Sequence, residues 1–175
     1  MLERLGAQVV QVRLPQQLDG LAGLIIPGGE STTMGKLAVH YGFMEPLRSF
    51  GQEKAIWGTC AGAIFLSKDV RRSQPLLGLM DITVQRNAFG RQVDSFEIDL
   101  DLAALQAARN GDRPFRAVFI RAPLIETVYG EAQILLTLPE GGIVAARQGR
   151  LLATSFHPEL TEDDRIHRYF LELAQ

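Results

Sequence analysis

The sequence has 175 residues, of which 46% are hydrophobic and 22% are charged, as is typical of a single globular domain. Eighteen Lys and Arg residues against twenty Asp and Glu residues give a net charge of −2, which indicates no nucleic-acid or anionic-membrane partner. The lone cysteine excludes an intramolecular disulfide, and the sequence shows neither a membrane span nor a signal peptide, so we expect one cytoplasmic domain over residues 1–175.

In the first part of the chain, apolar runs of strand length alternate with amphipathic stretches. This pattern predicts an α/β fold of three layers, with a mostly parallel sheet flanked by helices. Residues 3–5, followed by Gly6, look like the last turn of a helix that ends at a glycine cap. The sequence then predicts strands at residues 9–14, 24–26 and 55–57 and helices at residues 31–41, 44–52 and 61–67, with Ser31 or Thr32 as the N-cap of the first helix.

The second part of the chain has a stronger β character. The sequence predicts strands at residues 82–85, 95–100, 117–121 and 132–136, a helix at residues 101–108, a hairpin of residues 143–146 and 151–155 around the turn 147–150, and a helix at residues 161–174. Thr161 can cap this last helix, and the acidic residues that follow suit the positive end of its dipole.

The lone cysteine, Cys60, lies in the motif Gly58-Thr59-Cys60-Ala61-Gly62, between an expected strand and an expected helix. This context is typical of a nucleophile elbow, G-x-S-x-G, with sulfur in place of oxygen. Glycines two residues before and after the nucleophile avoid clashes at such a sharp turn. The alternative is a buried cysteine that only fills space, the more common fate of a lone thiol. The flanking glycines favour Cys60 as a nucleophile.

A cysteine nucleophile needs a base, and the sequence has three histidines. His40 and His167 lie in polar stretches of expected helices, and we expect both at the surface. His157 follows the end of a strand, where ligand sites of α/β proteins form. Glu159 can accept a hydrogen bond from Nδ1 of His157, which leaves Nε2 to take the thiol proton. These observations together predict a triad of Cys60, His157 and Glu159.

A Pro-Gly-Gly-Glu-Ser motif follows another expected strand and contains Gly28 and Gly29. Backbone N–H groups at these glycines could form an oxyanion hole together with the N–H of Ala61. A phosphate-binding loop is the alternative for residues 29–36. It is excluded because Leu37 stands where Ser or Thr would bind magnesium.

The motifs together resemble the triad-type (class I) glutamine amidotransferases, and within them the glutaminase subunits of pyridoxal 5′-phosphate synthase. The general resemblance rests on residues 27–33, 58–62 and 155–159, and the more specific one on residues 85–92, 94–97, 119–123 and 157–163. It covers essentially the whole chain. It implies the flavodoxin-like fold of the family, in which members usually open with a strand and a Leu-Gln-Gly-type loop. That first strand is absent from this sequence.

The resemblance implies a glutaminase. Cys60 would attack the side-chain amide of L-glutamine, His157 would help ammonia to leave, and Glu159 would orient His157. The glutamine would be held by Gly29, Glu30, Ser31, Arg86, Ile120 and Arg121. An arginine suits the α-carboxylate of glutamine, and Glu30 suits its α-ammonium group. No cofactor or metal is implied.

The implied partner is a TIM-barrel synthase subunit in a hetero-oligomer, which would use the ammonia to make pyridoxal 5′-phosphate. Three alternatives remain: a glutaminase for another synthase, as in the histidine or purine pathways; a catalytically impaired subunit that only assembles with the synthase; and a generic cysteine hydrolase, which nothing beyond the elbow supports.

Overall fold

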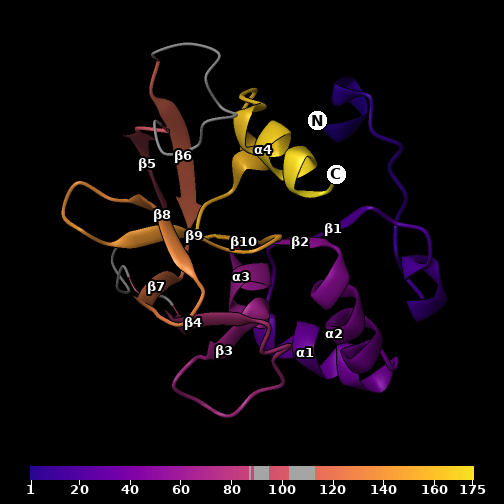
Figure 1. Cartoon of the computed structure of the whole chain (residues 1–175). Coiled ribbons are helices and arrows are strands. Elements are labelled where there is room, and N and C mark those ends of the chain that lie inside the picture. The colour runs from indigo at the N-terminus through magenta and orange to yellow at the C-terminus, as the bar shows by residue number, and fades with distance from the viewer. Residues whose placement is uncertain (87, 89–94, 103–112) are drawn as a thin grey trace.

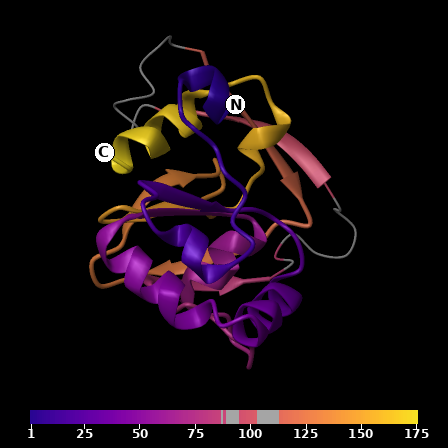
Figure 2. The ribbon, with the colours of Figure 1, turned by 90° about the vertical axis from the view of Figure 1, so that its right-hand side faces the viewer.

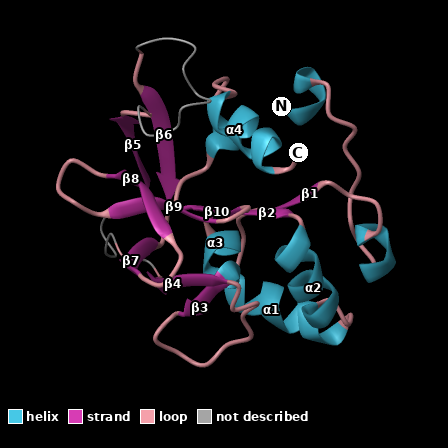
Figure 3. Ribbon diagram, viewed as in Figure 1, coloured by secondary structure: helices cyan, strands magenta, loops and turns pink. Residues whose placement is uncertain are grey.

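A central sheet with helices on both faces organises the chain (Figure 1). The computed structural model describes residues 1–86, 88, 95–102 and 113–175. Within these residues the predicted three layers are present: α1, α2 and α3 cover one face of the sheet, while α4 and a separate two-stranded sheet lie on the other (Figure 3). None of the helices in this part of the chain has the length and apolarity needed to cross a bilayer.

The order of elements follows the predicted alternation in the first part of the chain and turns to strands in the second. The first part contains η1 (Leu2–Leu5), η2 (Pro15–Leu18), β1 (Gly23–Ile26), α1 (Ser31–His40), α2 (Met44–Glu53), β2 (Ala55–Thr59) and α3 (Ala61–Leu66). The second part contains β3 (Ser67–Asp69), β4 (Met80–Gln85), β5 (Ser95–Leu100), β6 (Phe115–Ile120), β7 (Leu124–Val128), β8 (Gln133–Thr137), β9 (Ile143–Gln148), β10 (Leu151–Thr154), η4 (Pro158–Leu160) and α4 (Arg165–Leu173).

The main sheet is mixed, and the expectation of a mostly parallel sheet is wrong. Its strand order is β1-β2-β10-β9-β7-β4-β3, with β8 paired to β9. β2 runs parallel to β1 and β10, and β3 parallel to β4. β9 runs antiparallel to β10, β7 and β8, and β4 antiparallel to β7. Part of the cause lies in the connections: short turns join β8 to β9 and β9 to β10, and such turns can join only antiparallel neighbours.

The parallel strands β1, β2 and β10 fix the position of the three sequence motifs. Their registers pair Ile26 with Gly58 and Thr154 with Thr59, so all three strands end at the same edge of the sheet. The segments that follow them therefore emerge side by side, as expected for an α/β ligand site. This edge carries the candidate site.

The sheet separates two apolar cores. One core packs α1, α2 and α3 against the sheet and includes Phe65, Met80 and Ile82. The other lies below α4 and the β5–β6 pair and includes Trp57 and Phe156. Figure 2 shows α4 and the N-terminal η1 on the face opposite the three early helices.

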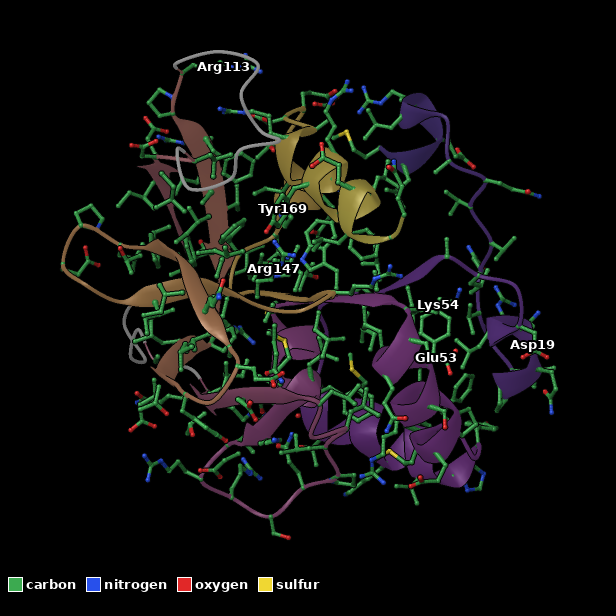
Figure 4. The ribbon with its side chains drawn as sticks, viewed as in Figure 1. Asp19, Glu53, Lys54, Arg113, Arg147 and Tyr169 are labelled. Carbon is green, nitrogen blue, oxygen red and sulfur yellow. The ribbon has the colours of Figure 1, made fainter. Side chains whose placement is uncertain are left out.

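Polar contacts tie α4 to its surroundings. Arg147 on β9 donates a hydrogen bond to the hydroxyl of Tyr169 on α4 at 3.2 Å, and the two side chains are labelled in Figure 4. The predicted start of this helix is too early. Thr161 lies after η4, and its hydroxyl bonds the Pro158 carbonyl instead of capping the helix, which begins at Arg165.

Residues 9–14 do not form the predicted strand. They run extended beside β1, but in the described part of the chain no backbone–backbone hydrogen bond joins residues 8–13 to a neighbouring strand. A groove of about 520 Å³ separates them from β1 and reaches Phe170 of α4. An extended segment without a partner forms no ladder, whatever its β propensity, so Val9 and Val10 stay exposed.

Other predicted elements agree closely with the structure. Gly6 ends η1 in the left-handed conformation with φ 85°, and Gly149 has φ 56° in the β9–β10 turn. The predicted helix at 101–108 falls mostly outside the described residues. The strands β3 and β7 were not predicted, because Ser67–Asp69 is short and polar and Leu124–Val128 alternates only weakly.

Candidate active site

Cys60 occupies a sharp turn between β2 and α3, as the elbow motif predicts. Its backbone angles, φ 50° and ψ −107°, lie in a region that non-glycine residues rarely adopt. The turn is held in place because the Cys60 N–H donates to the Thr154 carbonyl of β10 at 2.8 Å, and the Cys60 carbonyl accepts from Ala63 at 3.1 Å. The side chain lies at the N-terminus of α3 and is 8% exposed.

The structure confirms the steric reason for the glycines on either side of Cys60. A Cβ at Gly58 would lie 2.4 Å from the backbone of Gly62. A Cβ at Gly62 would lie 2.0 Å from the carbonyl oxygen of Ile26 at the end of β1. Both contacts are with backbone atoms, which cannot move aside without displacing α3 from the sheet. The two glycines therefore allow α3 to pack directly against the strand ends.

His157 and Glu159 form a close pair beyond the end of β10. The imidazole Nδ1 of His157 donates to Oε1 of Glu159 at 2.7 Å, the contact that the sequence predicts. The backbone N–H of His157 donates to the Val118 carbonyl of β6 at 2.8 Å, which fixes the ring's position at the sheet edge. The side chain of Cys60 also interacts with the His157 ring. Three residues from two distant segments are thus joined in the predicted order.

The charges in this group favour an imidazolium. The hydrogen bonds with Cys60 and with Glu159 raise the pKa of His157 from 6.5 to about 10. Burial opposes ionisation of Glu159, but the hydrogen bond from His157, a backbone hydrogen bond and the nearby histidine charges together keep the pKa of the carboxyl below its usual value of 4.5. His157 is therefore positively charged at neutral pH.

The predicted oxyanion-hole residues surround Cys60 and His157. A Cβ at Gly28 would lie 2.7 Å from Cε1 of His157 and 3.5 Å from Cβ of Cys60, so this position must lack a side chain. Gly29 has φ 147°, which a glycine adopts readily. Ala61 is the first residue of α3, where the N–H has no acceptor within the helix. Gly28 and Ala61 thus lie next to Cys60, where the oxyanion hole is predicted.

Glu30 is the N-cap of α1, in place of the predicted Ser31 or Thr32. Its carboxylate accepts the N–H of Thr32 at 3.0 Å and of Thr33 at 2.7 Å, and the Thr33 hydroxyl at 2.8 Å. These backbone hydrogen bonds lower the pKa of Glu30 from 4.5 to about 2. Glu30 remains a carboxylate at every physiological pH.

Arg86 reaches across to the start of α1 from the turn after β4. Its Nη2 donates to Oε1 of Glu30 at 2.9 Å, and its Nη1 donates to the Thr32 hydroxyl at 2.9 Å and to Oε1 of Gln74 at 3.0 Å. Ser31 is 1% exposed, and its hydroxyl accepts a hydrogen bond from Nε2 of Gln74 at 3.3 Å. The structure thus brings three of the predicted glutamine-binding residues together around a fourth side chain, Gln74, which sequence reasoning missed.

Ile120 and Arg121 lie at the end of β6, in the separate two-stranded sheet, on a strand that contacts the His157 segment. They follow Val118, whose carbonyl accepts the His157 N–H, by two and three residues. Ile120 is 42% exposed, so its side chain is accessible from solvent. Arg121 has φ 44°, a strained angle for this residue type.

The remaining histidines differ from one another. His40 is exposed, as predicted, whereas the expectation of a surface position for His167 is wrong. His167 is 5% exposed and its ring packs edge-on against Trp57 with 5.1 Å between the centroids. Burial lowers the pKa of His167 from 6.5 to about 4, so it is neutral. It lines a cavity of about 380 Å³ that Thr59 and Glu159 also border.

Comparison with protein families and known proteins gives a consistent result. The model of the SNO glutamine amidotransferase family matches residues 1–175. The pyridoxal 5′-phosphate synthase subunit PdxT of Roseiflexus sp. (strain RS-1) is 54% identical, over 99% of this chain and 91% of its own length. The subunit of the same name from Deinococcus radiodurans is 57% identical, over 99% of this chain and 88% of its own length.

Solved structures show the same fold. A crystal structure of a glutamine amidotransferase is 50% identical, superposes with a TM-score of 0.89, and is matched over 99% of this chain and 89% of its own. The structure of PurLQS from Thermotoga maritima is only 15% identical, with a TM-score of 0.62 over 90% of this chain and 82% of its own. The second likeness bears on the fold alone, which both structures share.

Proposed function

Because the chain belongs to the SNO glutamine amidotransferase family, we propose that Cys60, His157 and Glu159 are the catalytic triad through which it hydrolyses glutamine. The chain is a glutaminase subunit that supplies ammonia for pyridoxal 5′-phosphate synthesis. The observation that carries the triad assignment is the meeting of the elbow cysteine with the His157–Glu159 pair at one edge of the sheet.

The proposed reaction has two halves. The Cys60 thiolate attacks the side-chain amide carbon of glutamine, and the N–H groups at Gly28, Gly29 and Ala61 stabilise the oxyanion. His157 gives its proton to the departing nitrogen, so that ammonia leaves and a γ-glutamyl thioester remains. His157 then takes a proton from water, which attacks the thioester and releases glutamate and the thiol.

The remaining charged groups suit the two ends of the amino acid. We assign Arg86 to the α-carboxylate, because a guanidinium binds carboxylates through two parallel hydrogen bonds. Glu30 supplies negative charge for the α-ammonium group even though its oxygens already cap α1. Gly29, Ser31, Ile120 and Arg121 complete the proposed pocket, with Ile120 against the methylene groups of glutamine.

A partner subunit must consume the ammonia, and we propose a TIM-barrel synthase in a hetero-oligomer. The relatives are named subunits of pyridoxal 5′-phosphate synthase, which favours this partner over a synthase of histidine or purine synthesis. The well-formed His157–Glu159 contact favours an active enzyme over a subunit that only assembles.

The test of the triad measures glutamate release from glutamine by the chain with its synthase subunit. We expect Cys60→Ala to abolish release, a loss of at least about 10³-fold, because no other nucleophile can form the thioester. Cys60→Ala must still co-purify with the synthase, which separates lost chemistry from lost assembly. Undiminished turnover by this variant would overturn the mechanism, and failure of the wild-type complex to release glutamate would favour the assembly role.

A further inference from the structure

Gln74 is a neutral side chain placed at the centre of the proposed substrate-binding charges. Its Oε1 accepts from Nη1 of Arg86 at 3.0 Å and from the Thr32 hydroxyl at 3.5 Å, while its Nε2 donates to Ser31 at 3.3 Å. It belongs to the segment between β3 and β4, far in sequence from each of these residues. One amide thus connects the turn after β4 with the first turn of α1.

The backbone that directly follows Gln74 is held against α1 and α2. At Pro75, the carbonyl oxygen lies so close to α1 that a Cβ on Gly35 would be 2.5 Å from it. Further along, Arg48 of α2 donates to the carbonyls of Leu76 at 3.1 Å and Leu77 at 3.0 Å. A residue before proline also has a restricted backbone. The backbone after Gln74 is therefore tied to α1 and α2, and the Gln74 side chain is held by its three hydrogen bonds.

The Gln74 amide can orient the Arg86 guanidinium by a hydrogen bond without neutralising its positive charge. Arg86 already forms one ion pair, with Glu30. A second carboxylate at position 74 would compete with the α-carboxylate of glutamine for the guanidinium. A neutral amide oxygen instead accepts one N–H and leaves the positive charge available for the substrate.

We propose that Gln74 is a positioning residue that holds the Arg86 guanidinium in the orientation that binds the α-carboxylate of glutamine. The proposal rests on the proposed role of Arg86. Gln74 acts on substrate binding and not on the thioester chemistry, since its contacts are with Ser31, Thr32 and Arg86 and not with the triad. Its removal should therefore change KM and leave kcat nearly unaltered.

The first test measures glutaminase kinetics of the complex with the synthase subunit. We expect Gln74→Met, which keeps the length and loses the hydrogen bonds, to raise KM about tenfold with kcat within about twofold. Gln74→Glu should raise KM further, because its charge pairs with Arg86. The matched control is Gln148→Met, which loses a 2.6 Å hydrogen bond to the Asp81 N–H on β4 and should keep the wild-type KM.

The second test is a double-mutant cycle with Arg86→Met. If Gln74 acts through Arg86, Gln74→Met should change KM less than about twofold in the Arg86→Met background. Equal effects in both backgrounds would overturn the proposal, as would an unchanged KM in Gln74→Met alone. Alkylation of Cys60 by iodoacetamide, which needs no amino-acid pocket, should proceed at the wild-type rate in Gln74→Met and shows that the elbow is intact. The glutaminase mechanism is tested by the loss of glutamate release in Cys60→Ala, and the role of Gln74 by the change in KM. Failure of one hypothesis can therefore be distinguished from failure of the other.

Discussion

At the scale of single residues, the site is a set of charges held close together. His157 is surrounded by the Cys60 side chain on one side and the Glu159 carboxylate at 2.7 Å on the other. Its half-buried position reduces the screening by water that would weaken both interactions. The raised pKa of His157 is therefore a product of the two neighbours and should respond to the removal of either.

This response can be measured by NMR titration of the His157 ring. In the wild type we expect a pKa near 10, and we expect Cys60→Ala and Glu159→Gln each to lower it, the former more, because the hydrogen bond with Cys60 is its largest cause. The His167 resonance, with a pKa near 4 that arises mainly from burial, is an internal control and should hardly move in Cys60→Ala. An unchanged His157 pKa in both variants would contradict the proposed ion pair.

The same shift predicts how stability depends on pH. A group whose pKa is higher in the folded protein binds its proton more tightly there, so its contribution is complete below pH 6.5 and is lost as the pH rises towards 10. The difference in melting temperature between the wild type and His157→Gln should accordingly shrink between pH 7 and pH 10. A difference in melting temperature that grows over this range would show that folding does not raise the pKa of His157.

At the scale of elements, the sequence predicts the strand–turn–helix units well and the pairing of later strands poorly. The elbow at Cys60 and the β9–β10 hairpin carry local signals, glycines at required positions, that do not depend on distant parts of the chain. Strand direction depends on which neighbours meet, and hydrophobic periodicity does not report it. Residues 9–14 were predicted as a strand because their residue types favour one. Residue type does not determine whether a neighbouring strand is there to pair with.

Site residues follow the same division between local and distant signals. The meeting of Cys60, His157 and Glu159, the proposed triad, was predictable because each lies in a recognisable local motif. Gln74 stands in a segment without a pattern and acquires its contacts only through the fold. His167 was misplaced because polar neighbours in sequence hid the fact that it shares the buried face of α4 with Ile166 and Phe170. Contacts between residues far apart in sequence could therefore not be predicted from local sequence patterns.

The close packing of α3 against β1 gives a prediction at this scale. We expect Gly62→Ala to lower the free energy of unfolding by about 3 kcal/mol, since its new methyl group would lie 2.0 Å from the Ile26 carbonyl oxygen. Gly51→Ala in α2 is the matched control, because the nearest atom there is the flexible Cδ1 of Leu79, at 2.6 Å. Chemical denaturation should show Gly51→Ala within about 1 kcal/mol of the wild type. Equal effects of the two substitutions would contradict the packing argument.

At the scale of the whole molecule, the active site depends on contacts between layers. The segment that carries His157 and Glu159 leaves the sheet at β10, forms η4 and then enters α4. Its far end is fixed by Arg165, which is 4% exposed and pairs with Asp163 at 2.7 Å. The same guanidinium donates to the carbonyls of Arg113 at 2.8 Å and Pro114 at 3.0 Å, just before β6. One buried arginine thus joins the catalytic segment to the strand that also holds the His157 N–H.

Arg165 can stabilise the fold in two ways, through its ion pair with Asp163 and through its hydrogen bonds to two backbone carbonyls. Arg165→Met should lower the free energy of unfolding by about 3 kcal/mol, because the largely buried Asp163 carboxylate keeps only the 3.8 Å contact with the exposed Arg113, and two carbonyls lose their donors. The double variant Arg165→Met/Asp163→Asn should recover part of this loss, since position 163 no longer carries a charge, but not all of it, since the carbonyls of Arg113 and Pro114 stay without the guanidinium. Chemical denaturation of the wild type, Arg165→Met and the double variant measures the contribution of the Asp163 charge and that of the carbonyl hydrogen bonds. Arg168→Met, which breaks the more exposed pair with Asp164 at 2.8 Å, is the control and should cost less than about 1 kcal/mol. A double variant no more stable than Arg165→Met would contradict this account. The stability lost in Arg165→Met would then come from the lost hydrogen bonds to the two carbonyls alone, and not from the charge of Asp163.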